Sequence, residues 1–143
     1  MRWWDVEQVA GIEATVFADE GAWSVEQLWA ELAGVPARRR YVVAEAAQTV
    51  VGYAGISLAL DTADVMTVAV HPGWRGRGVG RRLVRALLDD ADTHGAREVL
   101  LEVRATNQAA IALYANLGFV TISTRRHYYG PGRDGVIMAR RAQ

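Results

Sequence analysis

The sequence predicts an α+β protein built around a mixed sheet, and two observations indicate this class. Two helical segments come first, and mainly strands follow, with two further helices between them. One strand–helix–strand unit, from Met66 to Val103, is expected to form a right-handed crossover and hence one parallel strand pair. The 143 residues are expected to form a single domain, 1–143, with one sizeable core.

The two N-terminal helices are indicated by capping signals. Asp5 with Gln8, and later Ser24 with Gln27, have the spacing of a capping box. Apolar residues follow at helical spacing, and the mostly apolar face of the first helix also contains Glu13. Both helices are therefore expected to pack one face against the rest of the protein.

The remaining elements are indicated by apolar runs and by the glycines between them. Gly95 and Gly118 are expected as left-handed residues that end two helices, and Gly52 and Gly55 predict a bulge or a close backbone approach. Strands are expected at Tyr41–Ala46, Val50–Leu60, Asp64–Val70, Val99–Val103, Phe119–His127 and Val136–Arg140, and helices at Val79–His94 and from Thr106 or Asn107 to Leu117.

Composition excludes several classes of function. The formal net charge is zero, so no overall field attracts nucleic acid or a membrane. Cysteine is absent, which excludes disulfides, thiol nucleophiles and thiolate metal sites, and the three histidines lack metal-ligand spacing. No signal peptide or membrane-length apolar run is present. We expect a cytoplasmic protein without a metal, as a monomer or weak dimer.

A glycine-rich segment joins a strand to a helix and resembles a phosphate cradle. Gly76, Gly78 and Gly80 let backbone N–H groups approach a ligand, and the helix that follows starts with unpaired N–H donors. Arginines in the first turns oppose the helix dipole, which an external polyanion would offset. A solvated face with Arg85 paired to Asp89 is the alternative.

The type of phosphate motif is narrowed by what the segment lacks. A Walker loop needs a lysine, and all sixteen basic residues of this chain are arginines. A dinucleotide fingerprint needs a glycine at position 81, where this chain has an arginine. The remaining pattern, Arg75-x-x-Gly78-x-Gly80, resembles the acetyl-CoA loop of the GNAT N-acetyltransferases.

A second motif makes this resemblance specific. Glu102-Val103-x-x-x-Asn107, continued by Leu113-Tyr114-x-x-x-Gly118-Phe119, resembles the second half of GNAT domains in order and separation. Within the family, the RimI branch acetylates the N-terminal alanine of a small-subunit ribosomal protein. Features that resemble this branch are Glu102-Val103-Arg104, the segment Asn107–Tyr114, Trp23-Ser24 and Arg125-Arg126-x-Tyr128-Tyr129.

The resemblance implies a fold, a cofactor and roles for individual residues. The fold would be a mostly antiparallel twisted sheet with one parallel strand pair, flanked by about four helices. Glu102 would be the general base and Tyr114 the general acid for direct acetyl transfer from acetyl-CoA to a protein N-terminus. Acetyl-CoA would contact Val68, Ala69, Val70, Arg75, Gly76, Arg77, Gly78, Val79, Gly80, Arg81 and Asn107, and the acceptor peptide would contact Trp23, Arg125, Tyr128 and Tyr129.

Other interpretations stay open at this point. Glu102 could be an ordinary solvent-facing acid, Tyr114 a core residue and Asn107 a simple helix cap. The acceptor could be a lysine side chain or a small amine instead of a protein N-terminus. The domain could also sense acetyl-CoA without turnover.

Overall fold

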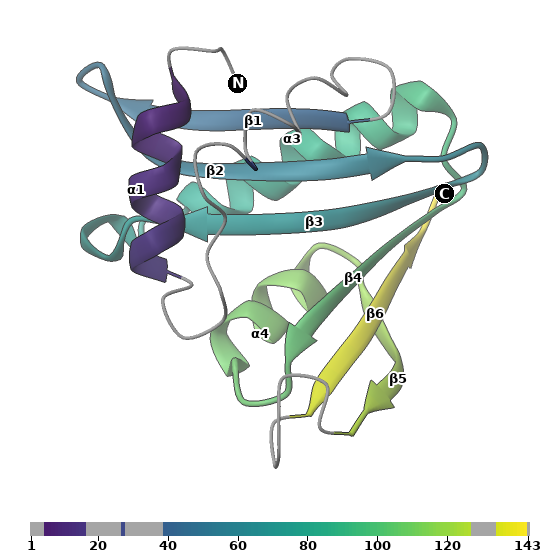
Figure 1. Ribbon diagram of the computed structural model, residues 1–143. Helices are drawn as coiled ribbons and strands as arrows, with labels where there is room; N and C mark the ends of the chain where they lie inside the picture. The colour runs from purple at the N-terminus through teal and green to yellow at the C-terminus, as the bar shows by residue number, and fades with distance from the viewer. Residues whose placement is uncertain (1–4, 17–26, 28–38, 127–133, 143) are drawn as a thin grey trace.

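The computed structural model describes residues 5–16, 27, 39–126 and 134–142, which form a six-stranded sheet with helices on both faces (Figure 1). The strand order is β1-β2-β3-β4-β6-β5. The strands are β1 (Arg39–Ala46), β2 (Thr49–Leu58), β3 (Thr62–Val70), β4 (Glu98–Arg104), β5 (Val120–Arg125) and β6 (Gly135–Arg141). The described helices are α1 (Val6–Val16), α3 (Val79–His94) and α4 (Gln108–Asn116), with a short 3₁₀ turn at Pro72–Trp74.

The expected fold class is confirmed. All described strand neighbours are antiparallel except β3 and β4, which are parallel and joined through α3. Each element matches its predicted range to within a few residues. The second expected helix lies outside the described residues apart from Gln27, as do Trp23, Tyr128 and Tyr129.

The core is divided between the two faces of the sheet. On one face, α3 and α4 pack against apolar residues of all the central strands, and Val84 and Leu87 are fully buried there. On the other face, α1 places Val9 and Ile12 against Tyr53 and other residues of β1–β3. Figure 1 shows α1 in front of the sheet and α3 behind it. A ligand that enters between β3 and β4 can thus be reached from both faces.

Two glycines of β2 admit close neighbours, as predicted. A Cβ atom at Gly55 would lie 2.3 Å from the Tyr41 ring, and one at Gly52 would lie 3.0 Å from the Ala69 carbonyl oxygen. The ladder between β2 and β3 also shifts register between Gly55 and Ile56, so Met66 on β3 is an extra residue. The bulge bends β3 just before the segment that borders the cleft described below.

The strands β3 and β4 pair only briefly before they diverge. Their described ladder joins Thr62–Asp64 to Glu98–Leu100 and goes no further. Beyond these residues the two strands open into a V, with α4 beside the gap (Figure 1). The backbone of β3 after Asp64 therefore has polar groups directed at the gap, which a ligand can use.

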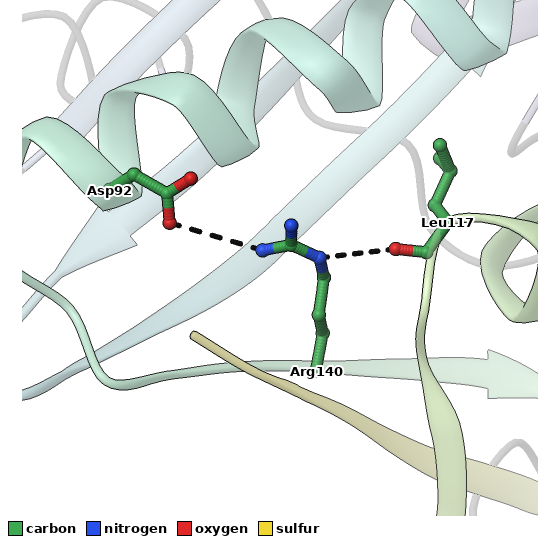
Figure 2. Close-up of polar contacts among 3 residues, drawn as sticks. All are labelled: Asp92, Leu117 and Arg140. Atoms are coloured by element: carbon green, nitrogen blue, oxygen red, sulfur yellow. Dashed lines mark hydrogen bonds and ion pairs between the residues drawn. The ribbon is translucent and has the colours of Figure 1, made fainter. Parts of the chain in front are cut away.

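The sheet has two halves, β1–β3 and β4–β6. Arg140 joins them on the face that α3 and α4 cover. Its Nε donates a hydrogen bond to the Leu117 carbonyl at the end of α4, at 3.1 Å. Its Nη1 lies 3.9 Å from Oδ1 of Asp92 on α3. Figure 2 shows the guanidinium between these two groups. One side chain of β6 thereby connects the C-terminal ends of two helices.

Candidate active site

A cleft of about 880 Å³ occupies the gap between the diverging strands. Its walls come from five elements: the end of β3, the glycine-rich loop, the start of α3, the end of β4 and one side of α4. The last residues of α1 also border it. Segments far apart in the sequence are brought together here because the splayed strands leave both their edges open.

The glycine-rich loop has the backbone geometry that an anion site requires. Gly76 and Gly78 have φ of 77° and 81°, in the left-handed region that favours glycine. A Cβ atom at either position would meet no atom of the described residues within 4 Å. Packing against the protein therefore does not explain these glycines, whereas backbone conformation and access for a ligand do.

Helix α3 presents its N-terminal N–H groups to the cleft. Gly78 is its N-cap and makes no side-chain capping bond. The first helical hydrogen bond runs from the Arg82 N–H to the Gly78 carbonyl, at 3.1 Å. The N–H groups of residues 79–81 precede this bond and have no helical acceptor. With the helix dipole, they favour an anion at this end of the cleft.

Most of the predicted cofactor residues border the cleft, and two do not. The guanidinium of Arg77 lies 4.9 Å from the centre of the Trp74 ring, in a cation–π contact. Ala69 is buried in the cluster around α1. The predicted residues that line the cleft are Val68, Val70, Arg75, Gly76, Gly78, Val79, Gly80, Arg81 and Asn107.

Glu102 lies on β4 and lines the cleft. Leu101 and Val103 on either side of it pack into the core under α3, so alternation directs Glu102 to the face that carries α1. Its carboxylate lies 3.5 Å from Nη1 of Arg125 on β5, and the two side chains are 29% and 52% exposed. Arg125 thus contacts the candidate base, and its role in acceptor binding stays a prediction.

A second carboxylate near Glu102 has a raised pKa. Burial raises the pKa of Asp64 above its ordinary value of 3.8, and the negative charge of Glu102 raises it further. Asp64 is in the last described pair between β3 and β4, opposite Leu100. The charge of Glu102 is therefore felt as far as the point where the two strands diverge.

Tyr114 packs in the core and also borders the cleft, and its role as general acid stays a prediction. The residue is only 8% exposed, and its ring packs edge-on against Phe119, with 5.8 Å between ring centres. The Phe119 N–H donates to the Tyr114 carbonyl at 3.0 Å, and the Gly118 N–H donates to the Ala115 carbonyl at 3.1 Å. This is the predicted Schellman ending. Tyr114 also lines the cleft, so Glu102 and Tyr114 border one cavity.

Asn107 acts as the helix cap of α4. Its Oδ1 accepts a hydrogen bond from the Ala110 N–H at 3.1 Å. The residue borders the cleft as well. The capping role is confirmed, and the cofactor contact stays a prediction.

Four polar residues that line the cleft were not among the predicted site residues: Glu13, Thr67, Arg104 and Thr106. Glu13 of α1 is 5% exposed, and its Oε2 accepts a hydrogen bond from the hydroxyl of the fully buried Tyr53. Glu13 and Thr67 both line the cleft. A signal for Glu13 was present in the sequence, because it is a carboxylate within an apolar helical face.

Comparison with known proteins assigns the family. The sequence profile of the "Acetyltransferase (GNAT) family" matches residues 3–119. The chain belongs to the GNAT family. This assignment agrees with the fold and with the position of the glycine-rich loop at the start of α3.

Two mycobacterial relatives match nearly the whole of this GNAT domain. "N-alpha-acetyltransferase RimI" of Mycobacterium tuberculosis is 41% identical over 141 residues, which cover 95% of this chain and 86% of that protein. An uncharacterized protein of Mycobacterium leprae is 43% identical over 144 residues, which cover 97% of this chain but only 39% of that protein.

A solved structure extends the likeness to three dimensions. The ribosomal-protein-S18-alanine N-acetyltransferase from Escherichia coli superimposes with a TM-score of 0.87 at 30% identity. The superposition covers 99% of this chain and 90% of that one. This chain and that enzyme therefore share one fold over nearly their whole lengths. No helix in the described part of this chain is long and apolar enough to span a membrane.

Proposed function

We propose that this GNAT domain transfers the acetyl group of acetyl-CoA to the N-terminal α-amine of a protein, in particular to the N-terminal alanine of a small-subunit ribosomal protein. The observation that carries the proposal is that Glu102, Tyr114 and the glycine-rich loop border one cleft. The names of the M. tuberculosis and E. coli relatives support this choice of acceptor.

The loop end of the cleft would bind the pyrophosphate of acetyl-CoA. The N–H groups at the start of α3 supply hydrogen-bond donors, and Arg75 and Arg81 add positive charge. The rest of the cofactor would extend along the open edge of β3, where backbone groups of Val68 and Val70 can bind the pantetheine arm. The thioester would then lie near the middle of the V.

The transfer itself requires a neutral amine and a stabilised leaving group. In the proposed reaction Glu102 accepts a proton from the amine, directly or through water. The amine nitrogen bonds to the acetyl carbon, and the bond from that carbon to sulfur breaks. Tyr114 donates its phenolic proton to the departing thiolate. Direct attack needs no nucleophilic side chain, which agrees with the absence of cysteine.

The proposal is tested with purified protein, acetyl-CoA and a short peptide that copies the N-terminus of the ribosomal protein, starting at alanine. We expect one acetyl group on the terminal amine, detected by mass, together with release of one equivalent of CoA. The same peptide with a blocked N-terminus and an added internal lysine is the control. Equal acetylation of both peptides would show that the acceptor is not the N-terminus.

A further inference from the structure

Glu13 is a buried carboxylate that the mechanism above does not use. It lies in a mostly apolar cluster formed by α1 and by strands β1–β3, together with Val9, Ile12 and Tyr53. A buried carboxylate is costly unless donors or cations surround it. The Tyr53 hydroxyl is one of the donors that stabilise this carboxylate, and the residue also lines the cleft.

Thr67 supplies a second polar group on the same side of the sheet. It is two residues before Ala69, which packs in the cluster around α1, so alternation directs both side chains to that face. The Oγ1 atom of Thr67 is buried and has no hydrogen-bond partner within the described part of the chain. A buried hydroxyl without a partner at the wall of a cleft suits a ligand that accepts its hydrogen bond.

The position of these groups indicates which substrate they would meet. In the proposed function, the glycine-rich loop and the start of α3 would hold the phosphates of acetyl-CoA on the side of the cleft that carries α3 and α4. Glu102 and Thr67 are directed to the opposite face, and Glu13 reaches the same cleft from the helix that covers that face. An acceptor that approaches from the face of α1 would meet Glu13 and Thr67 beside Glu102.

We propose that the Glu13 carboxylate, held in place by Tyr53, binds the positively charged amine of the acceptor, and that Thr67 donates a hydrogen bond to the carbonyl group next to that amine. An α-amine of a peptide has such a carbonyl two bonds beyond its nitrogen, whereas a lysine side-chain amine does not. The pair of contacts therefore selects a protein N-terminus over a lysine side chain. This inference rests on the proposed function and explains how the domain would select its acceptor.

The test measures how much the amine contributes to peptide binding. Two unreactive complexes are compared by calorimetry with CoA bound, one with the alanine peptide and one with the same peptide whose terminal amine is replaced by hydrogen. At pH 6.5 an ordinary terminal amine is mostly protonated. We expect the wild-type protein to bind the amine peptide about 10- to 100-fold more tightly.

Matched variants assign that preference to a residue. Glu13→Gln keeps an acceptor for Tyr53 and removes the charge, so we expect the preference to fall close to one. Glu7→Gln removes an exposed carboxylate from the same helix and is expected to keep the wild-type preference. Thr67→Val is expected to weaken selection of the terminal amine over a lysine-containing peptide.

Steady-state kinetics provide an independent readout. Glu13→Gln is expected to raise KM for the peptide about 10-fold, with kcat within about 3-fold of wild type and KM for acetyl-CoA unchanged. Thermal unfolding and CoA affinity show whether the variant is folded, and Glu13→Asp is the replacement if it is not. That variant keeps the charge but shortens the side chain, so we expect an intermediate preference.

Several results would overturn the inference. One is equal binding of both peptides by the wild-type protein. This result does not depend on whether any variant folds. A second is a preference for the amine peptide that is unchanged in Glu13→Gln. A third is a preference that Glu102→Gln abolishes and Glu13→Gln does not. The proposed function fails separately, if no peptide is acetylated while the amine preference and its dependence on Glu13 persist.

Discussion

The two halves of the divided sheet contribute to the site in different ways. The half with β1–β3 contributes mainly backbone: an open strand edge, two left-handed glycines and the N–H groups of α3. The half with β4–β6 contributes side chains, Glu102 from β4 and Tyr114 from the adjoining α4. We infer that one half holds the cofactor and the other performs the proton transfers.

This division predicts different sensitivities to substitution. A backbone site changes only when backbone conformation or space changes, so most side-chain substitutions there should be mild. A proton-transfer site depends on individual functional groups, so conservative substitutions there should have large effects. The following variants test the comparison, from the largest expected effect to the smallest.

The largest effect is expected for Glu102→Gln. Loss of a general base should lower kcat about 10²- to 10⁴-fold and leave the affinity for acetyl-CoA near normal. Glu98→Gln removes a carboxylate from the same strand, paired there with the exposed Arg141, and is the control. Steady-state kinetics and calorimetry measure both quantities. Unchanged turnover in Glu102→Gln would remove this residue from the mechanism.

Tyr114→Phe is expected to have a smaller effect on rate. Phenylalanine keeps the packing against Phe119 and loses only the hydroxyl. A thiolate is a good leaving group, so loss of the acid should lower kcat about 10²-fold, at the low end for general acid catalysis. The unfolding temperature should hardly change. A kcat equal to that of the wild type would leave Tyr114 with a packing role alone.

Gly78→Ala tests the half that contributes backbone. An alanine with φ near 81° is strained by about 1–2 kcal/mol, although its Cβ would meet no atom in the described part of the chain. We expect the loop to shift and the Kd for acetyl-CoA to rise about 10-fold, with kcat at saturation little affected. Gly11→Ala in α1, where a Cβ also meets no atom, is the control. Equal Kd values in Gly78→Ala and wild type would contradict the assigned loop geometry.

Arg140→Met tests the connection between the two halves. The variant loses the hydrogen bond to the Leu117 carbonyl and the contact with Asp92 (Figure 2). We expect the free energy of unfolding in urea to fall by about 1–2 kcal/mol. Arg141→Gln, which loses only an exposed ion pair with Glu98, should change it by less than about 0.5 kcal/mol. Similar losses in both variants would show that Arg140 does not connect the halves.

The smallest effect is expected for Asp64→Asn, at the point where the halves meet. The pKa of Asp64 is raised by burial and then by Glu102, so the folded protein binds the proton more tightly than the unfolded chain. The resulting stabilisation is complete below the ordinary pKa of 3.8 and is lost as pH rises through the raised pKa. The free energy of unfolding of Asp64→Asn, relative to wild type, should therefore rise over this window.

Urea unfolding between pH 3 and pH 8 measures this dependence, with Asp89→Asn as the baseline for loss of a surface carboxylate. Glu102→Gln should narrow the window, because it removes the second cause of the raised pKa. A difference between wild type and Asp64→Asn that does not vary with pH would contradict the assigned environment of Asp64.

Most local features could be predicted from the sequence, because they depend on a few neighbouring residues. The cap at Asn107, the ending at Gly118 and Phe119, and the left-handed loop glycines follow from local hydrogen bonds and backbone conformation. The fold class followed from the order of helices and strands. The two family motifs placed the candidate catalytic residues in the correct elements.

The tertiary structure decided which of these groups meet. That Glu102 and Tyr114 border one cleft depends on the splay of β3 and β4, which arises from strand pairing over long sequence distances. The contacts of Arg125 with Glu102, and of Glu13 with Tyr53, each join segments more than twenty residues apart. The sequence by itself determined the chemistry available and its local geometry. Only packing between distant elements could bring a buried carboxylate of α1 to the cleft, because burial is a property of the assembled chain.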